Sequence, residues 1–288
     1  MDIYTKAYDA PTSKFQDLRA VITSRLAAQA IPVSLRTYAV IATEDTDFTL
    51  LTIQVPNRRL QFQRRGDVMH AGLEIYGQLV TLSGRIVQVF EKGLDVDVPE
   101  KDFPEWNNRD LVYQEAAPLR PAIYKLSVVV KDSQNGQMGS AEQGIRVPSF
   151  DTEMLTNSSL ILADEVGAPQ ADSGASDPFL IGGNRVVPNG DHVFSRQKEL
   201  GIYTEIYGLA IDPATHKTSF AIEFRILREG KTILDQTQKT HGPSIVYVVE
   251  KKVHLNSLLL PGDYKLELRI TDLVRTQAIS PNTMFKLR

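Results

Sequence analysis

From Pro32 onward, apolar and polar residues alternate in short runs along the chain. Such runs, bounded by glycine, proline or polar residues, are typical of β-strands with one buried face. Apolar residues between 15 and 29 recur near helical spacing instead and predict one short helix. The predicted strands lie at 33–40, 48–55, 73–80, 84–91, 124–132 and 141–147 in the first half, and at 201–207, 220–227, 245–253, 264–271 and 278–287 in the second.

Two sequence blocks occur twice, in the same order. Glu-Ile-Tyr-Gly stands at 74–77 and 205–208, and a Pro-x-x-Tyr-x-Leu block that ends in aspartate stands at 121–132 and 261–272. Recurrence of both blocks indicates a duplicated domain of about 130–140 residues. We therefore expect Tyr76 to be equivalent to Tyr207, and Tyr124 to be equivalent to Tyr264.

These patterns predict an all-β protein with two tandem β-sandwiches of the immunoglobulin or fibronectin-III type. Residues 1–32 are expected to form a loose lead-in and the short helix, residues 33–150 the first sandwich and residues 151–288 the second. Asn135-Gly136 predicts a type I′ hairpin turn, because both residues tolerate positive φ.

Tyr124 and Tyr264 begin the most regular strand of each half. In immunoglobulin-like sandwiches a tyrosine at this place folds back at a corner, and its hydroxyl bonds to the backbone a few residues upstream. A proline three residues before each tyrosine fixes the entering chain. Asp132 and Asp272 end the two strands, where a side-chain oxygen can cap the next turn. The alternative is that both tyrosines are plain core aromatics.

Charge and composition exclude several classes of function. The chain has 32 basic and 35 acidic side chains, so no overall field draws it to nucleic acid or to an anionic membrane. Paired arginines flank Phe62, but arginines also protect strand edges, and we expect no nucleic-acid partner. We expect no membrane insertion and no signal peptide, because no apolar run is long enough. The absence of cysteine excludes disulfides and leaves the compartment open.

Catalytic and cofactor motifs are not recognisable. We find no nucleophile elbow, phosphate-binding loop, paired-histidine zinc motif or dinucleotide fingerprint, and the five histidines are scattered. Asp95, Asp97 and Asp102 lie close together and could supply oxygen ligands to Ca²⁺. Since Asp95 and Asp97 alternate with apolar residues, a solvated strand face explains them without a metal, and we expect no cofactor.

Phe103 and Trp106 lie in a proline-bracketed loop. They could form an aromatic platform for a sugar ring or a partner protein. The alternative is that Trp106, the only tryptophan, packs under its own loop.

The strand pattern resembles a known group of proteins. Asp17–Val21, Ile31–Tyr38 and the strands through Tyr124 look like the C-terminal half of acidobacterial VWFA-related proteins, and Gly182–Tyr207 is similar to the C-terminal β-region of GWxTD-domain proteins. The Gly-Trp-x-Thr-Asp motif and the Asp-x-Ser-x-Ser motif of the metal-dependent adhesion site are both missing. The resemblance therefore implies accessory sandwiches, and it implies an extracytoplasmic location because such proteins are typically exported.

The sequence leads to three hypotheses about function. The first is a non-enzymatic scaffold or protein-interaction module outside the cytoplasm, whose protein partner the sequence does not identify. The second is a carbohydrate-binding module that uses Phe103 and Trp106 to hold a glycan. The third is a hydrolase with an unrecognised site, although no nucleophile–base pair is visible.

Overall fold

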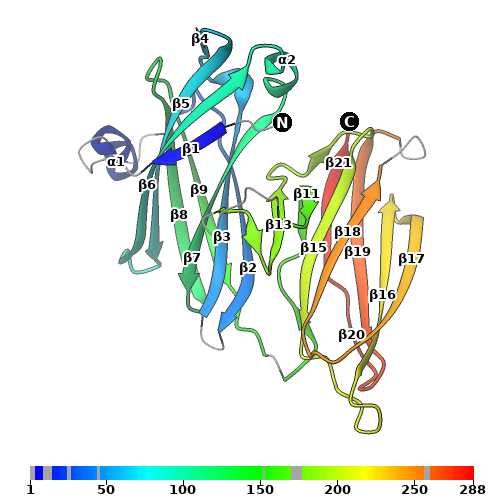
Figure 1. The fold of residues 1–288 in the computed structure, drawn as a ribbon. Coiled ribbons are helices and arrows are strands. Elements are labelled where there is room, and N and C mark those ends of the chain that lie inside the picture. Colours follow the sequence, from blue (N-terminus) through cyan, green and yellow to red (C-terminus); the bar gives the residue numbers. More distant parts are fainter. Residues whose placement is uncertain are drawn as a thin grey trace. The chain divides into compact units, whose positions relative to one another are not determined.

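The computed structural model describes residues 4–8, 15–24, 27–43, 46–151, 153–169, 177–255 and 260–288. They form an all-β protein with one short N-terminal helix, as the sequence predicts (Figure 1). The chain divides into two compact units. Unit 1 comprises Met1–Thr37 and Leu51–Val147, and unit 2 comprises Tyr38–Leu50 and Pro148–Arg288.

The predicted boundaries place residues 38–50 in the first sandwich, whereas the structure assigns them to unit 2. Tyr38, Val40 and Leu50 belong to an apolar cluster with residues of unit 2 such as Ile161. The backbone N–H of Ala39 also donates to Ser159 Oγ at 2.9 Å. Alternation along a strand shows which residues are buried, but it does not show against which part of the chain.

Unit 1 has a main sheet and part of a smaller one, whose strands β2 and β3 also include residues of the segment Tyr38–Leu50 that is assigned to unit 2. The main sheet has the order β1-β6-β5-β8-β9, with β4 also paired to β5, and the smaller sheet has the order β2-β3-β7. Leu126, Val128 and Val130 alternate along β8 and are fully buried in the core of the unit. The elements are β1 Tyr4–Tyr8, β2 Ser34–Thr43, β3 Thr46–Pro56, the 3-10 turn η2 Asn57–Arg59, β4 Gln63–Arg65, β5 Val68–Thr81, β6 Ile86–Pro99, α2 Phe103–Trp106, β7 Asp110–Leu119, β8 Ala122–Asp132 and β9 Met138–Val147.

The N-terminal segment is more ordered than predicted. Residues 4–8, expected to be a loose lead-in, form β1, which pairs antiparallel with β6 from Gly93 to Asp97. Edge pairing uses backbone groups, so it requires no apolar alternation in the added strand. The helix α1, Gln16–Ser24, lies within the predicted range 15–29 and is shorter. Phe15 and Leu18 pack on Tyr76 and Val129.

Unit 2 contains two six-stranded sheets around a second apolar core. One sheet has the order β10-β15-β11-β13-β12, with β18 paired to β15, and the other has the order β14-β21-β19-β16-β17, with β20 paired to β19. The strands are β10 Thr156–Asn157, β11 Ile161–Gly167, β12 Leu180–Ile181, β13 Asn184–Pro188, β14 Val193–Phe194, β15 Glu199–Tyr207, β16 Thr218–Arg228, β17 Lys231–Gly242, β18 Tyr247–His254, β19 Gly262–Asp272, β20 Gln277–Ile279 and β21 Asn282–Leu287.

Strand registers relate β8 to β19 and β5 to β16. Asp132 at the end of β8 lies opposite Leu73 of β5, and Asp272 at the end of β19 lies opposite Phe220 of β16. The two strands that carry Tyr124 and Tyr264 therefore hold corresponding positions in their sheets.

The predicted equivalence of Tyr76 and Tyr207 is wrong. Tyr76 is on β5, which is hydrogen-bonded to β8, whereas Tyr207 is on β15, which lies in the sheet that does not contain β19. The glycines after them also serve different purposes. A Cβ on Gly77 would lie 1.9 Å from the ring of Phe90, whereas Gly208 has a φ of +68°. The same four residues thus occur in two different packing environments.

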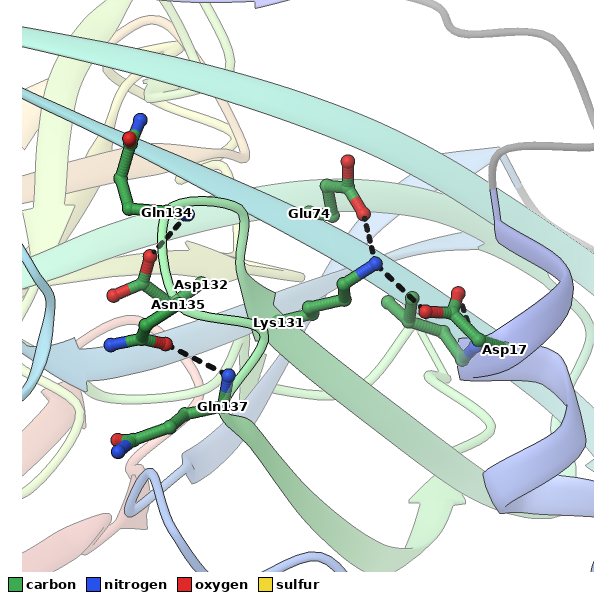
Figure 2. A network of polar contacts seen from close by, with 8 residues as sticks. Asp17, Glu74, Lys131, Asp132, Gln134, Asn135 and Gln137 are labelled. Carbon is green, nitrogen blue, oxygen red and sulfur yellow. Dashed lines mark hydrogen bonds and ion pairs between the residues drawn. The ribbon is translucent and has the colours of Figure 1, made fainter.

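The predicted type I′ turn at Asn135-Gly136 is also wrong. Gly136 has positive φ and Asn135 does not. The loop is instead held by side chains, because Asp132 Oδ1 accepts the N–H of Gln134 and Asn135 Oδ1 accepts the N–H of Gln137, each at 2.8 Å (Figure 2). Positive φ at two consecutive residues occurs at Glu229-Gly230, which joins β16 to β17.

Candidate functional site

The predicted aromatic platform is a packed cluster. Trp106 is 8% exposed, and its ring meets Phe62 edge-on at 5.3 Å. The rings of Phe62 and Phe103 lie 5.0 Å apart and are inclined by 58°. Asn57 Nδ2 donates to the Trp106 carbonyl at 2.9 Å, which fixes the α2 loop on the core of unit 1. A sugar platform needs an exposed ring face, and Trp106 does not present one. Phe62 belongs to the cluster and was not predicted.

The predicted acidic residues do not gather at one point. Asp95 and Asp97 lie on β6, where they alternate with the buried residues Leu94, Val96 and Val98. Asp102 precedes α2, and its Oδ2 is buried without a hydrogen-bond partner in the part of the chain that the structure describes. No group of three or more His, Cys, Asp or Glu side chains among the described residues is arranged to hold a metal ion.

A buried histidine pairs with one of these aspartates. His70 Nδ1 lies 2.7 Å from Asp97 Oδ1 across β5 and β6. The pair is a cross-strand contact, so the scattered histidine positions in the sequence did not reveal it. An Asp–His pair becomes a hydrolytic triad only when a hydroxyl or thiol bonds the other ring nitrogen. Within the described ranges, His70 makes no such contact.

The most concentrated polar group in unit 2 lies on β15. Tyr203, Glu205 and Tyr207 share one face of the strand, and the two phenols donate to Glu205 Oε1 and Oε2 at 2.6 and 2.8 Å. Burial, followed by the nearby carboxylate, raises the pKa of both phenols, so they remain protonated donors. A Cβ on Gly182 would lie 2.4 Å from Tyr203 Oη, so this backbone closes over the hydroxyl. The hydroxyls and the carboxylate of this group are thus paired with one another.

Asp47, also in unit 2, is a buried carboxyl with an unsatisfied oxygen. It is 4% exposed, and burial raises its pKa to about 6. Its Oδ2 has no hydrogen-bond partner among the described residues. The same is true of Oγ1 of Thr49, two residues further along the chain. Perturbed carboxyls mark functional sites in some proteins. Here no group of three or more metal-ligand side chains accompanies it in the described ranges.

The two repeated tyrosines make the same backbone hydrogen bond. Tyr124 Oη donates to the Arg120 carbonyl at 2.9 Å, and Tyr264 Oη donates to the Leu260 carbonyl at 2.6 Å. In both cases the acceptor lies four residues upstream, in the residue before the proline. This is the geometry of a tyrosine corner. Tyr264 is additionally stacked on Phe285, with ring centroids 5.5 Å apart.

The repeated aspartates have a role beyond the predicted cap. Asp132 Oδ2 accepts the N–H of Gln61 at 2.6 Å, and Asp272 Oδ2 accepts the N–H of Ala210 at 2.8 Å. The other oxygen of each carboxylate caps the turn that follows its strand. Both carboxylates are fully buried. Each aspartate therefore ties its turn to a loop distant in sequence, a partner that the sequence did not identify.

The helix α1 covers one part of the main sheet of unit 1. Lys131 donates to Asp17 of α1 at 2.7 Å and lies 3.4 Å from Glu74 of β5 (Figure 2). The hydrogen bond to Asp17 is the main cause that raises the pKa of Lys131. We call the sheet face that carries Tyr76 and Val129, on which α1 packs, the outer face.

No helix or strand of the described residues covers the same outer face at the β5–β6 hairpin. On β6, Ile86 lies opposite Val80 of β5, and Val89 lies opposite Gln78. On β8, Ile123 directly precedes Tyr124, which lies opposite Thr81 at the same end of β5. We define the apolar hairpin patch as Leu82, Ile86, Val89 and Ile123, which are 77%, 52%, 42% and 41% exposed. Four large aliphatic side chains at one end of a sheet are thus left in contact with solvent.

No family model and no curated protein matches the chain. Solved structures with weak similarity include a β-glucuronidase from Parabacteroides merdae, at 10% identity and a TM-score of 0.26, and a trypsin-activated α2-macroglobulin from Escherichia coli, at 8% identity and a TM-score of 0.26. The alignments cover 86% and 91% of this chain but only 29% and 17% of those structures. The chain thus spans less than a third of either one, and the similarity carries no inference about function. No helix of the described residues is long and apolar enough to cross a membrane.

Proposed function

We propose that this chain is a non-catalytic tandem β-sandwich module that binds a protein partner outside the cytoplasm. The apolar hairpin patch of unit 1 is the observation that carries the proposal. Single exposed apolar side chains are common on folded domains, whereas exposed apolar patches mark interaction sites. The extracytoplasmic location rests on the resemblance to accessory sandwiches of exported proteins.

The surroundings of the patch suit a protein interface. Lys125 and Glu142 form an exposed ion pair at 2.8 Å on the neighbouring strands β8 and β9. An apolar centre beside charged side chains is the usual arrangement of such interfaces. The packing of Phe15 and Leu18 on Tyr76 shows that apolar side chains from a helix can cover this face. We therefore favour a partner that presents aliphatic side chains.

A carbohydrate-binding role has less support. The rings that could stack on a sugar, Phe103 and Trp106, pack with Phe62 at inclined angles. The four side chains of the apolar hairpin patch are aliphatic and are not aromatic. Aliphatic side chains contribute to protein interfaces through buried area, whereas sugar platforms depend on ring faces.

Site-specific photo-crosslinking in the native cell tests the proposal. A photoreactive residue at Val89 should capture a discrete partner, while the same residue at Met284 should not, although Met284 is 58% exposed. The Ile86→Asp substitution should abolish capture at Val89 without changing the thermal unfolding of the purified protein. Equal capture at Val89 and Met284, or capture that is insensitive to Ile86→Asp, would contradict the proposal.

A further inference from the structure

The strand β17 leaves one full edge of its sheet unpaired. It pairs with β16 along its length, and no strand of the described residues pairs with its other side (Figure 1). Nine of its twelve residues are exposed, and none is proline. By contrast, β6 pairs with β5, the strand that corresponds to β16, and its outer edge is partly covered by β1. An open, regular edge strand is a template for another strand.

The exposed stretch of β17 is complementary to itself. If two copies pair antiparallel around Thr237, Asp235 of each copy lies opposite Lys239 of the other, and Gln236 lies opposite Gln238. Each pair occurs twice because the contact has a two-fold axis. Opposite charges and paired threonines are among the cross-strand pairs that stabilise sheets. We propose that β17 binds β17 of a second copy of this chain in this register.

The charges inside the sheet support this register. Glu267 of β19 lies opposite Arg225 of β16, and Arg225 lies opposite Asp235 of β17. Glu267 and Arg225 form an ion pair. This row across three strands therefore alternates in sign and ends on a carboxylate at the open edge. Lys239 of a second copy would continue the alternation.

Neighbouring registers that keep the same sheet faces together are less favourable. Pairing centred on Gln236 or Gln238 does not set Asp235 opposite Lys239. Pairing centred on Asp235 sets two aspartates opposite each other, and pairing centred on Lys239 sets two lysines opposite each other. Like charges directly opposite destabilise a strand pair. The register around Thr237 is the one that satisfies both charges of each copy. An edge contact is small, so we expect a weak dimer.

Sedimentation velocity over a range of protein concentrations tests the dimer. The wild-type chain should associate as concentration rises. Asp235→Lys and Lys239→Asp should each weaken self-association by more than about tenfold, which is 1.4 kcal/mol of binding free energy. An equimolar mixture of the two variants should associate again, because every opposing pair in the mixed dimer is then complementary.

Two controls keep the test decisive. Lys231→Asp makes the same charge change as Lys239→Asp on the same strand, but outside the central pairs. This variant should associate like the wild type. Thermal unfolding checks that Asp235→Lys, which places a lysine opposite Arg225, is folded. A wild-type chain that stays monomeric throughout, or a variant mixture that fails to associate, would overturn the proposal. The inference goes beyond the proposed function and does not depend on it, because the apolar hairpin patch belongs to unit 1.

Discussion

The two Glu-Ile-Tyr-Gly segments are identical in sequence and different in structure, whereas the two tyrosine blocks share few residues and hold corresponding positions. Glu74 faces Lys131, while Glu205 accepts hydrogen bonds from two phenols. The tyrosine blocks each keep one hydroxyl-to-backbone bond and one doubly used carboxylate. Equivalence therefore follows from side chains with a specific hydrogen-bonding role, and short identity alone does not establish it.

Removing the repeated aspartates should have the largest effect. Asp132→Ala and Asp272→Ala each leave buried N–H groups without acceptors, and we expect a loss of about 3–4 kcal/mol of unfolding free energy. Urea unfolding measures it, with Trp106 fluorescence reporting on unit 1 and circular dichroism on both units. Asn at either position keeps one acceptor oxygen and should lose about half as much. If Asp272→Ala left the free energy of unfolding unchanged, the two aspartates would not have the same structural role.

The second-largest effect should come from Glu205, and it should exceed that of Glu74. Glu205→Ala leaves the buried Tyr207 phenol without its acceptor and leaves Tyr203 only the Ile181 carbonyl, at 3.2 Å, and we expect a loss of about 2–3 kcal/mol. Glu74 is also buried, but Glu74→Ala removes only one contact of Lys131, which retains Asp17, so the loss should be smaller than that of Glu205→Ala. Denaturant melts of both variants provide the comparison. Equal losses of unfolding free energy would contradict the different hydrogen-bonding roles of Glu74 and Glu205.

The third-largest loss of unfolding free energy should come from the repeated tyrosines. Tyr124→Phe and Tyr264→Phe keep the ring and lose the corner hydrogen bond, at a cost of about 1–3 kcal/mol each. Tyr264 should cost more, because Arg228 Nη1 also lies 3.4 Å from its hydroxyl. The two effects should add in the double variant. Tyr247→Phe, whose hydroxyl contacts the exposed Gln238, is a control that should change stability by less than about 0.5 kcal/mol.

Asp47 should give the smallest effect, with the opposite sign. Its pKa in the fold, about 6, lies above the value of an unfolded aspartate, so its ionisation destabilises the fold. Asp47→Asn should therefore stabilise the protein by about 1 kcal/mol at pH 8. This gain should shrink as the pH falls through about 6 and vanish near about 4. Unfolding measured at several pH values checks it, and a gain independent of pH would show that Asp47 is not ionised at pH 8.

The sequence by itself determined the fold class, the short helix and many of the strand-forming segments, because alternation and helical spacing are local properties. The strands β1, β7 and β17 were not among the predicted ones. It also indicated the bonds of Tyr124 and Tyr264, since their acceptors lie only four residues away. Only the tertiary structure decided the assignment of residues 38–50 to unit 2, the second role of Asp132 and Asp272, and the non-equivalence of Tyr76 and Tyr207. Each of these depends on which distant segment meets a buried face, and local sequence does not encode that contact.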